Sequence, residues 1–448
     1  MDLNSVVERL AGADRLITVR STVDPVHELA GVARRLEGEP KAVLFTDVAG
    51  ASAPVLTGLY WHRDILAELL GVPEPELPAY VAGRITAWQR DPIQPVVVTE
   101  APVREVADSV DLRAIPVPTH ATRDAGPYLD AAVVVARHPE TGVRNASIQR
   151  FLVSGPDELR INIDRGRHLE SYLAAAHERG EPLRFSLNIG VDPAVHFAAA
   201  APAEAAPIDT DELGIASAFY GEPIRLVPGD AAGVELVADA QWALECEIRP
   251  GELAEEGPFA EVTGLYAVEG KRPVVHVTAV HRRREPIFHT ILSGREVWNS
   301  VGLLGEANVL ATVSRQVPGV RDVYFAHGGG GFYEAVVAIE QRRAGLAKQA
   351  IMATFAAFPP LKIVKVVDTD VNIRDAEDVN WAMAQRMDAG TGVLVVPGVF
   401  GHELNPTFRG NIGTKIGFDA TRPVPHSPEG DRVAYTDIDL NRYDVTGL

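Results

Sequence analysis

Two hydrophobic patterns divide this chain of 448 residues near residue 300. Before that point, alternating apolar and polar residues predict strands at residues 95–99, 130–136, 146–153, 159–163, 233–237, 241–248 and 273–281. After it, helical spacing at residues 297–313, 345–355 and 376–386 alternates with strands at residues 323–326, 362–367 and 392–396. This strand–helix rhythm predicts a second, separate α/β domain.

The first hundred residues combine both patterns. Helices are predicted at residues 5–10, 26–36 and 64–70, a strand at residues 41–45 and a proline-rich connection at residues 72–78. One helix, at residues 169–179, interrupts the β-rich middle. We therefore expect a mixed α/β and β protein with an N-terminal α/β region (1–110), a β-rich domain (111–300) and a C-terminal α/β domain (301–448). The polar stretch after Thr421 is predicted to be an arm that packs on a neighbour or frays.

Charge and cysteine content narrow the classes of partner. The 42 basic and 61 acidic residues give a net charge of −19, which argues against nucleic acid because phosphates need a clustered basic surface. No apolar run approaches the roughly 18 residues that a membrane-spanning helix needs. The N-terminus lacks the apolar core of a signal peptide. The single cysteine, Cys246, lies in an alternating apolar stretch, so we expect a packed thiol and a cytoplasmic protein.

The first polar cluster runs from Asn145 to Arg150, at the start of a predicted strand. In one continuous strand, Arg150 would share a face with Ala146 and Ile148. An arginine on an apolar strand face is costly without an anionic partner, and its guanidinium suits bidentate binding of carboxylate or phosphate. The alternative is a structural arginine held in a salt bridge.

The second polar cluster runs from Asp164 to His168 and opens the predicted helix at residues 169–179. A helix start with two arginines and a histidine is a natural anion site. The neutral imidazole of His168 is also suited to binding a metal. The alternative is a histidine that lies on the surface or caps the helix.

The third polar cluster places Glu256 and Glu261 on either side of a turn that Gly257-Pro258 forces. Two acids held on one tight loop are suited to general acid and base roles with separated pKa values. The alternative is a solvated acidic loop. None of the three clusters determines a function when taken singly.

Taken together, the clusters resemble the motif series of the UbiD-type decarboxylases in order and approximate spacing. The segments that carry the resemblance are Asn145-x-x-Ile-x-Arg150, His168, Glu212, Glu256-Gly-Pro-Phe-x-Glu261-x-x-Gly264, Lys362-Ile-Val-Lys-Val-Val-Asp368, Val379-x-Trp381-Ala382 and Gly413-Thr-Lys-Ile-Gly-Phe-Asp419-Ala-Thr421. The Glu-Gly-Pro-Phe-x-Glu element and the closing element from Gly413 are the most specific. The resemblance covers roughly residues 20–425.

The resemblance implies a cofactor site for prenylated FMN and a divalent metal, usually Mn²⁺, with K⁺ as a further candidate ion. The implied metal ligands are Asn145, His168 and Glu212, with Glu222 as the alternative to Glu212. The implied flavin contacts are Ile148, Gln149, Arg150, Arg167 and His168, and the implied phosphate contact is Lys362, with Lys365 as its alternative. Mixed oxygen and nitrogen ligands suit such a cation.

The same resemblance implies a catalytic network of Glu256, Arg150 and Glu261. Arg150 would position the substrate carboxylate, Glu256 would tune Arg150, and Glu261 would return a proton after CO₂ leaves. The implied reaction is reversible, non-oxidative decarboxylation of an aromatic, heteroaromatic or α,β-unsaturated acid through a covalent substrate–flavin adduct. Candidate pocket residues by position are Arg167, His289, Arg295, His327 and residues 400–408. Arg167 is hypothesised to contact a second polar group of the substrate.

For the fold, the resemblance implies a split β-barrel flavin-binding domain and a C-terminal α/β domain that drives assembly into a homodimer or homohexamer. The implied partners are a small carboxylic acid, CO₂ and a flavin prenyltransferase that supplies the cofactor. Two alternatives remain open from the residues: an FMN-binding oxidoreductase and a non-catalytic flavin-binding subunit. The three metal-type residues weigh against the first, and the intact Glu–Arg–Glu set weighs against the second.

Overall fold

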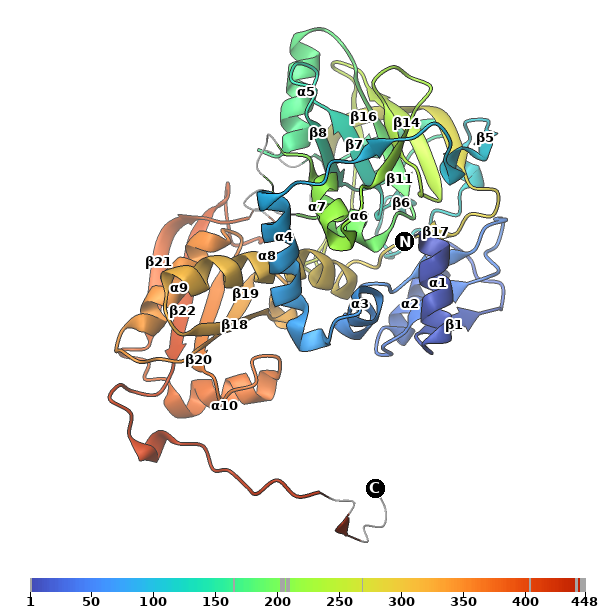
Figure 1. Cartoon of the computed structure of the whole chain (residues 1–448). Helices are drawn as coiled ribbons and strands as arrows, with labels where there is room; N and C mark the ends of the chain where they lie inside the picture. Colours follow the sequence, from blue (N-terminus) through green and yellow to red (C-terminus); the bar gives the residue numbers. More distant parts are fainter. Residues whose placement is uncertain are drawn as a thin grey trace.

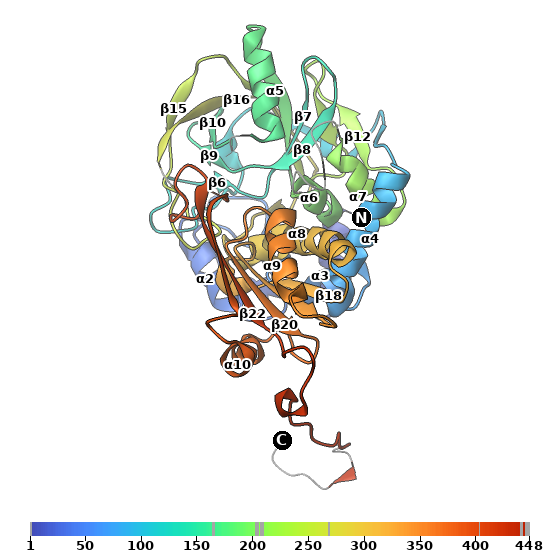
Figure 2. The same ribbon diagram turned by 90° about the vertical axis from the view of Figure 1, so that its left-hand side faces the viewer.

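The structure is a computed structural model that describes residues 2–163, 166–201, 206, 210–267, 269–402, 404–439 and 442–443. The sheets and helices form an N-terminal α/β unit, a β-rich domain and a C-terminal α/β domain with an extended tail (Figures 1 and 2). The predicted mixed α/β and β fold class is confirmed. Within the described ranges, no helix has the length and apolar character needed to cross a membrane.

The N-terminal unit is a four-stranded sheet with helices packed on it. Its elements are α1 (Leu3–Gly12), β1 (Leu16–Val19), α2 (Glu28–Leu36), β2 (Ala42–Phe45), β3 (Val55–Thr57), α3 (Arg63–Leu70), η1 (Glu74–Glu76) and α4 (Leu77–Arg90). The strand order is β1-β2-β3-β17, so β17 (Phe288–His289) returns from far along the chain to pair with β3. This pairing ties the segment before α8 (Arg295–Gln316) to the N-terminal unit.

The β-rich domain is built on a ten-stranded sheet. Its members are β5 (Val106–Asp108), β6 (Tyr128–Leu129), β7 (Val133–Arg137), β8 (Arg144–Ile148), β9 (Phe151–Val153), β10 (Glu158–Ile161), β11 (Leu183–Ile189), β14 (Trp242–Ile248), β15 (Leu253–Glu256) and β16 (Gly270–Arg282). A three-stranded sheet joins β4 (Val96–Val97), β12 (Arg225–Pro228) and β13 (Glu235–Val237). The helices are α5 (His168–Glu178), α6 (Pro193–Ala199) and α7 (Glu212–Tyr220), with short turns η2 (Pro102–Arg104) and η3 (Leu112–Ala114).

The ten-stranded sheet is curled so that its two ends meet. The pairing order is β6-β9-β10-β16-β14-β11-β7-β8, which places β8 and β9 near opposite ends of the path. Along the chain, however, only Gln149 and Arg150 separate these two strands. Because each residue spans at most about 3.6 Å, the two ends must lie side by side. Arg150 therefore sits at the seam of the sheet.

The C-terminal domain is a five-stranded sheet flanked by helices (Figure 1). Its elements are α8, β18 (Val320–Phe325), η4 (His327–Gly329), β19 (Glu334–Ile339), α9 (Leu346–Ala357), β20 (Ile363–Asp368), α10 (Ala376–Arg386), β21 (Val393–Phe400), β22 (Ile412–Ala420) and η5 (Pro428–Gly430). The strand order is β18-β19-β20-β22-β21, with β19, β20 and β22 parallel. The central strands are apolar runs, as expected for parallel strands buried on both faces.

Helix α8 connects the C-terminal domain to the rest of the protein through buried polar contacts. Glu306 forms a bidentate ion pair with Arg63 of α3, at 2.6 and 2.8 Å. The carboxylate of Glu296, near the start of α8, accepts from Gly58 N at 2.8 Å and from Thr57 Oγ1 at 2.9 Å. These contacts fix the position of α8 against the N-terminal unit.

Several sequence predictions need correction. The single strand predicted at residues 146–153 is two strands, because the chain leaves the sheet at Gln149 and Arg150 to cross the seam. Arg150 and Ile148 therefore do not lie on the same face of one continuous strand. The proline-rich connection predicted at residues 72–78 runs into the start of helix α4, because proline is well tolerated in the first helical turn, where Pro78 lies. Cys246 is buried, as predicted.

Several further elements were not predicted, and α7 and β22 show why. Helix α7 buries nearly its whole circumference, so it lacks the one-sided apolar stripe that marks a surface helix. Strand β22 contains glycine and lysine among its apolar residues, which hid its alternation. Helix α6 ends at Ala199, and residues 202–205 lie outside the described residues.

Candidate active site

A cavity of about 550 Å³ lies where the β-rich domain meets α8 and the C-terminal domain. The titratable residues of its lining come mainly from the β-rich domain, and both that domain and the other two parts contribute apolar residues. The residues used below are Asn145, Ile148, Gln149, Arg150, Arg167, His168, His196, Glu212, Phe259, Glu261, Phe358, Phe400 and His402. Such a cavity suits a ligand with an anionic end and a flat apolar body.

Three predicted ligand residues converge in this lining. Asn145 Nδ2 lies 2.8 Å from Glu212 Oε1 and 3.2 Å from His168 Nδ1. His168 Nδ1 lies 3.1 Å from Glu212 Oε1. The residues come from β8, from the first position of α5 and from the first position of α7. The structure thus brings together three side chains that are far apart in the sequence.

The local fold explains how Glu212 reaches this point. Asp211 caps α7 by accepting from Leu213 N at 3.1 Å, and it also forms an ion pair with Arg144 of β8. Arg144 precedes Asn145, so this ion pair holds the start of α7 against the strand that carries Asn145. Glu212 Oε2 also accepts from Ala146 N at 2.9 Å. Glu222 is exposed beyond the end of α7 and is not part of the cluster.

The cluster fits a divalent cation. Asn145 Oδ1 is buried and has no hydrogen-bond partner, which is costly for an amide oxygen. A half-turn of the amide exchanges its oxygen and nitrogen, so that oxygen, imidazole nitrogen and carboxylate oxygen face one point. This donor set suits a hard to borderline ion such as Mn²⁺.

Arg150 holds two acids at the seam of the sheet. Its Nη1 forms an ion pair with Glu261, and its Nη2 and Nε lie 3.3 Å from the two oxygens of Glu256. The guanidinium carbon lies 5.0 Å from the centre of the Phe259 ring. Tyr128 Oη donates to Glu256 Oε1 at 3.0 Å. The predicted Glu–Arg–Glu set is therefore one connected group.

The two acids of this group face different surroundings. Glu261 and Arg150 line the cavity, whereas Glu256 is not among the described lining residues and its side chain is fully buried. Tyr128 and Arg150 together satisfy both oxygens of Glu256. Glu256 is thus a fixed anchor for Arg150, and Glu261 is the acid in reach of a ligand.

The other predicted contacts are more dispersed. Arg167 is exposed and lines the cavity, and Ile148 and Gln149 line it as well. Lys362 is not among the described lining residues, and its Nζ donates to Thr407 Oγ1 at 2.9 Å. Lys365 forms an ion pair with Glu334 at 2.6 Å. Asp164 and Arg165 of the second cluster lie outside the described residues.

Three pocket candidates do not line the cavity as described. Arg295 and His327 line a smaller second pocket together with Arg63, Tyr324 and Arg374. His289 is buried beside the cavity, with its ring 6.0 Å from that of His196, a residue that does line it. Residues 400–408 contribute Phe400, Gly401, His402 and Leu404 to the lining.

Sequence reasoning missed two cavity residues. His196 is fully buried, both its ring nitrogens lack a hydrogen-bond partner, and burial lowers its pKa well below the usual value. Its sequence context, an alanine-rich helix, carries no signal. Asp130 accepts from Thr290 Oγ1 at 2.9 Å, and burial raises its pKa to about 7. Asp130 opens a predicted strand, where an acid is normally exposed.

Comparisons with known proteins place the chain in a family. Family models of 3-octaprenyl-4-hydroxybenzoate carboxy-lyase (UbiD) match residues 7–85 with the N-terminal domain, residues 95–296 with the Rift-related domain and residues 299–420 with the C-terminal domain. The protein in the cooM 5′ region of Rhodospirillum rubrum is 62% identical over 100% of this chain and 96% of its own length. Anhydromevalonate phosphate decarboxylase of Methanothermobacter thermautotrophicus is 34% identical over 94% of this chain and 97% of its own length.

Solved structures show the same fold. The UbiD-class enzyme HmfF from Pelotomaculum thermopropionicum, in complex with FMN, superimposes with a TM-score of 0.93 at 39% identity, over 99% of this chain and 100% of HmfF. An evolved dimeric form of HmfF in complex with prFMN gives a TM-score of 0.89 at 37% identity, over 99% of both chains. Fold and site together define a carboxy-lyase. The chain belongs to the UbiD family, and the resemblance read from its motifs is confirmed.

Proposed function

We propose that the protein catalyses reversible, non-oxidative decarboxylation of an aromatic, heteroaromatic or α,β-unsaturated carboxylic acid with prenylated FMN. The observation that carries this proposal is the Arg150 guanidinium, which joins one buried acid and one cavity-facing acid. The FMN and prFMN complexes of HmfF support the choice of cofactor. Anhydromevalonate phosphate decarboxylase supports the choice of reaction.

The residues present fit the cofactor and its metal. Asn145, His168 and Glu212 would hold a Mn²⁺ ion, because the three side chains converge and Asn145 Oδ1 is unpaired. Ile148 and Gln149 would line the flavin. When bound, prenylated FMN supplies the acceptor for the electron pair that the departing CO₂ leaves behind. A flavin prenyltransferase must provide it.

The protein's own groups bind the substrate and move a proton. Arg150 binds the substrate carboxylate, and Glu256 with Tyr128 holds the guanidinium in place for it. Glu261 delivers the proton that replaces CO₂, because it is the acid of the pair that faces the cavity. In the carboxylation direction the same carboxylate removes that proton. The apolar side chains opposite exclude water from the reacting carbon.

The experiment compares Glu261→Gln with Glu255→Gln, a neighbouring exposed acid on β15. Both proteins are produced together with a flavin prenyltransferase, and CO₂ release is measured over a panel of aromatic and unsaturated acids. We expect Glu261→Gln to lose about 10²–10⁴-fold in kcat, as removal of a general acid does, with the cofactor absorbance unchanged. Glu255→Gln should behave as wild type.

Other outcomes would select the alternatives. Wild-type protein that binds plain FMN and releases no CO₂ from any acid would favour an oxidoreductase or a non-catalytic subunit. Turnover by Glu261→Gln at the wild-type rate would remove Glu261 from the proton-donor role while leaving the reaction class intact.

We also propose that Arg167 contacts a second polar group of the substrate, since it lines the cavity next to His168. Arg167→Gln should then change the ranking of acids in the same CO₂-release panel. A uniform loss over all acids would instead place Arg167 at the cofactor.

A further inference from the structure

Two side chains in the cavity wall carry buried polar atoms without partners. His196 lines the cavity from α6, and among the described residues neither of its ring nitrogens has a hydrogen-bond partner. Ser293 lines the same cavity from the segment before α8, and its buried Oγ also finds no partner within the described part of the chain. An unpaired buried polar group is costly and uncommon in folded proteins. Neither residue belongs to the metal cluster or to the Glu–Arg–Glu set.

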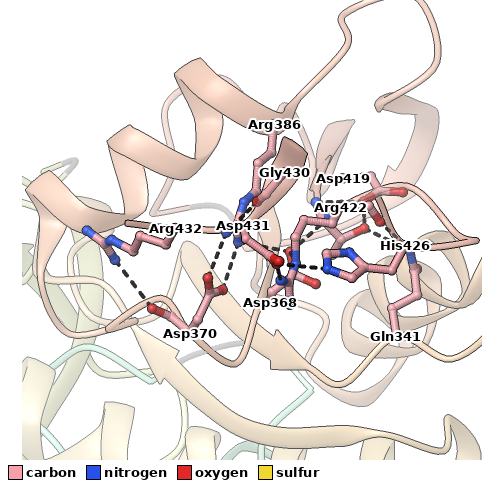
Figure 3. A network of polar contacts seen from close by, with 11 residues as sticks. Gln341, Asp368, Asp370, Arg386, Asp419, Arg422, His426, Gly430, Asp431 and Arg432 are labelled. Carbon is pink, nitrogen blue, oxygen red and sulfur yellow. Dashed lines mark hydrogen bonds and ion pairs between the residues drawn. The ribbon is translucent and has the colours of Figure 1, made fainter. Parts of the chain in front are cut away.

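Other buried polar groups of this protein are paired by the protein itself. In the network of Figure 3, the two Nη atoms of Arg386 reach Asp368 at 3.0 Å and Asp370 at 2.7 Å. The buried carboxylate of Glu296 accepts from Leu292 N at 2.7 Å as well as from β3 and the residue that follows it. His196 and Ser293 differ from these groups because they line a cavity, from which a ligand can supply the missing partner.

The ring of His196 is held in place by its neighbours. It stacks on the Tyr60 ring with 4.6 Å between the centroids and 17° between the planes, and the His289 ring lies 6.0 Å away. Helix α6 is capped by Asp192, which accepts from Ala194 N at 2.6 Å. A polar group that is already fixed loses little conformational entropy when it binds a partner. The imidazole is therefore preorganised for a ligand.

Ser293 is fixed by the two residues that precede it. Asp130 accepts from Ile291 N at 3.2 Å, and Glu296 accepts from Leu292 N at 2.7 Å. These two carboxylates come from different parts of the fold, and both already have donors within the protein. They hold the backbone just before Ser293 in place, so its hydroxyl has a defined position in the cavity wall.

The two residues are suited to a neutral polar group. Burial lowers the pKa of His196 well below its usual value, so the imidazole is neutral and has one donor and one acceptor nitrogen. The hydroxyl of Ser293 also both donates and accepts. Because neither residue brings a charge, they favour a ring hydroxyl or a ring N–H over a second carboxylate or a phosphate.

We propose that His196 and Ser293 form a polar subsite that binds a hydroxyl or N–H group on the ring of the substrate acid. This inference rests on the proposed decarboxylase function and adds the substrate class to it. Arg150 binds the carboxylate of the acid, and the polar subsite binds the ring group. Ile291 and Val297, which line the cavity on either side of Ser293 in the chain, offer apolar surface to the ring itself.

The polar subsite discriminates between acids by what it leaves unpaired. An acid with a plain hydrocarbon ring displaces water from the two residues and offers them no hydrogen bond in return. A site built to bond a substrate O–H or N–H rejects the analogue that lacks this group much more strongly than an apolar pocket distinguishes two apolar rings. The protein should therefore prefer hydroxylated aromatic acids or heteroaromatic acids with a ring N–H.

The test uses pairs of acids that differ in this group. The pairs are 4-hydroxycinnamate with cinnamate, 3,4-dihydroxybenzoate with benzoate, and pyrrole-2-carboxylate with thiophene-2-carboxylate, so hydroxyl and N–H are tested separately. Calorimetry of the full chain loaded with FMN gives Kd for each acid, and CO₂ release by the chain loaded with prenylated FMN gives kcat/KM. The variants are His196→Phe and Ser293→Ala. The control is His426→Phe, because His426 lies in the network of Figure 3, 2.8 Å from Asp431.

We expect the wild type to prefer the O–H or N–H member of at least one pair by about 10-fold or more, the effect of one unpaired buried group. His196→Phe keeps a stacked ring but has no ring nitrogen, so it should reduce this preference about 10-fold by weakening the polar member alone. Ser293→Ala should reduce it less, and His426→Phe should retain it. Equal Kd for both members of every pair in the wild type, or no binding of any acid, would overturn the proposal.

Thermal melts separate this role from a structural one. His196→Phe removes atoms that have no hydrogen bond to lose, so its Tm should equal or exceed that of the wild type. A lower Tm with equal loss of turnover for both members of a pair would instead mark His196 as structural and overturn its part in the polar subsite. A wild type that releases no CO₂ from any acid, yet keeps the preference in Kd, would overturn the proposed function and leave the polar subsite intact.

Discussion

Two clusters in the β-rich domain contain similar metal-ligating residue types. They differ in whether their buried polar atoms already have hydrogen-bond partners. Asn145, His168 and Glu212 lie in the cavity lining, and Asn145 Oδ1 has no partner. The second cluster is Asp230, Glu245 and His281, whose ligand atoms lie within 4.8 Å of one another. Residue types alone would rank the second cluster as the better metal site.

In the second cluster, donors of the protein itself already satisfy the carboxylate of Glu245. Glu245 accepts from Asp230 N at 2.6 Å, from Ala231 N at 2.8 Å and from His281 Nε2 at 3.1 Å. A Cβ at Gly229 would lie 2.8 Å from Glu245 Oε1, so glycine lets the turn close over the carboxylate. The difference teaches that a ligand site is marked by an unsatisfied buried atom facing a cavity, and a structural site by satisfied ones.

The largest effect that this comparison predicts is at Glu212. Glu212→Gln removes the carboxylate of the cavity cluster. We expect metal affinity and decarboxylation to fall at least about 100-fold, beyond the 10–100-fold that loss of an outer-shell partner costs. Metal content by mass spectrometry and CO₂ release measure this. A variant that retains stoichiometric Mn²⁺ would break the comparison.

The next effect is at Glu245, where we expect the reverse pattern. Glu245→Gln places an amide where a carboxylate accepts two backbone N–H groups, so at least one of these partly buried donors loses its partner. The cost is about 1–3 kcal/mol, which lowers Tm by several degrees. Calorimetry measures the loss, and metal content should stay at the wild-type level. Loss of metal in this variant would show that the second cluster, Asp230, Glu245 and His281, binds an ion.

The acid dependence of stability sharpens the same contrast. Burial alone would raise the pKa of Glu245, but hydrogen bonds from His281, Asp230 N and Ala231 N outweigh it and hold the pKa below its usual value. The unfolded state therefore binds this proton more readily than the folded state. The stabilisation is present above the ordinary value of 4.5 and is lost as pH falls through the lower folded pKa. The Tm difference between wild type and Glu245→Gln should be full near pH 7 and shrink below about pH 4.5; a constant difference would contradict this origin.

The smallest expected effect on Tm is at the exposed ion pair between Arg104 and Asp230 of the second cluster. Arg104 pairs with Asp230 at 2.5 Å, but their side chains are 31% and 58% exposed. An exposed pair of this kind contributes about 0–1 kcal/mol. Arg104→Gln should therefore change Tm by no more than a degree or two at moderate salt. A larger change would mean that Asp230 needs Arg104 to hold the turn over Glu245.

Much of the fold was open to prediction from local pattern. The alternation of apolar and polar residues in β14 and β16 and the helical spacing in α8 and α10 are written in consecutive residues. Helix α7 was not predicted because it is buried on nearly all sides and therefore has no one-sided apolar pattern. The interruption between β8 and β9 at Gln149 and Arg150 was not predicted, because it results from closure of the sheet, which no local pattern encodes.

The site divides in the same way. The sequence alone supplied the candidate side chains, because their order along the chain is recognisable: Asn145, Arg150, His168, Glu212, Glu256 and Glu261. Only the tertiary structure decided that Glu212 rather than Glu222 meets His168, that Glu261 rather than Glu256 faces the cavity, and that His196 lies in the wall. The reason is physical: burial, unpaired atoms and the direction of a side chain depend on segments far apart in the chain, which come together only when the sheet curls and α8 docks.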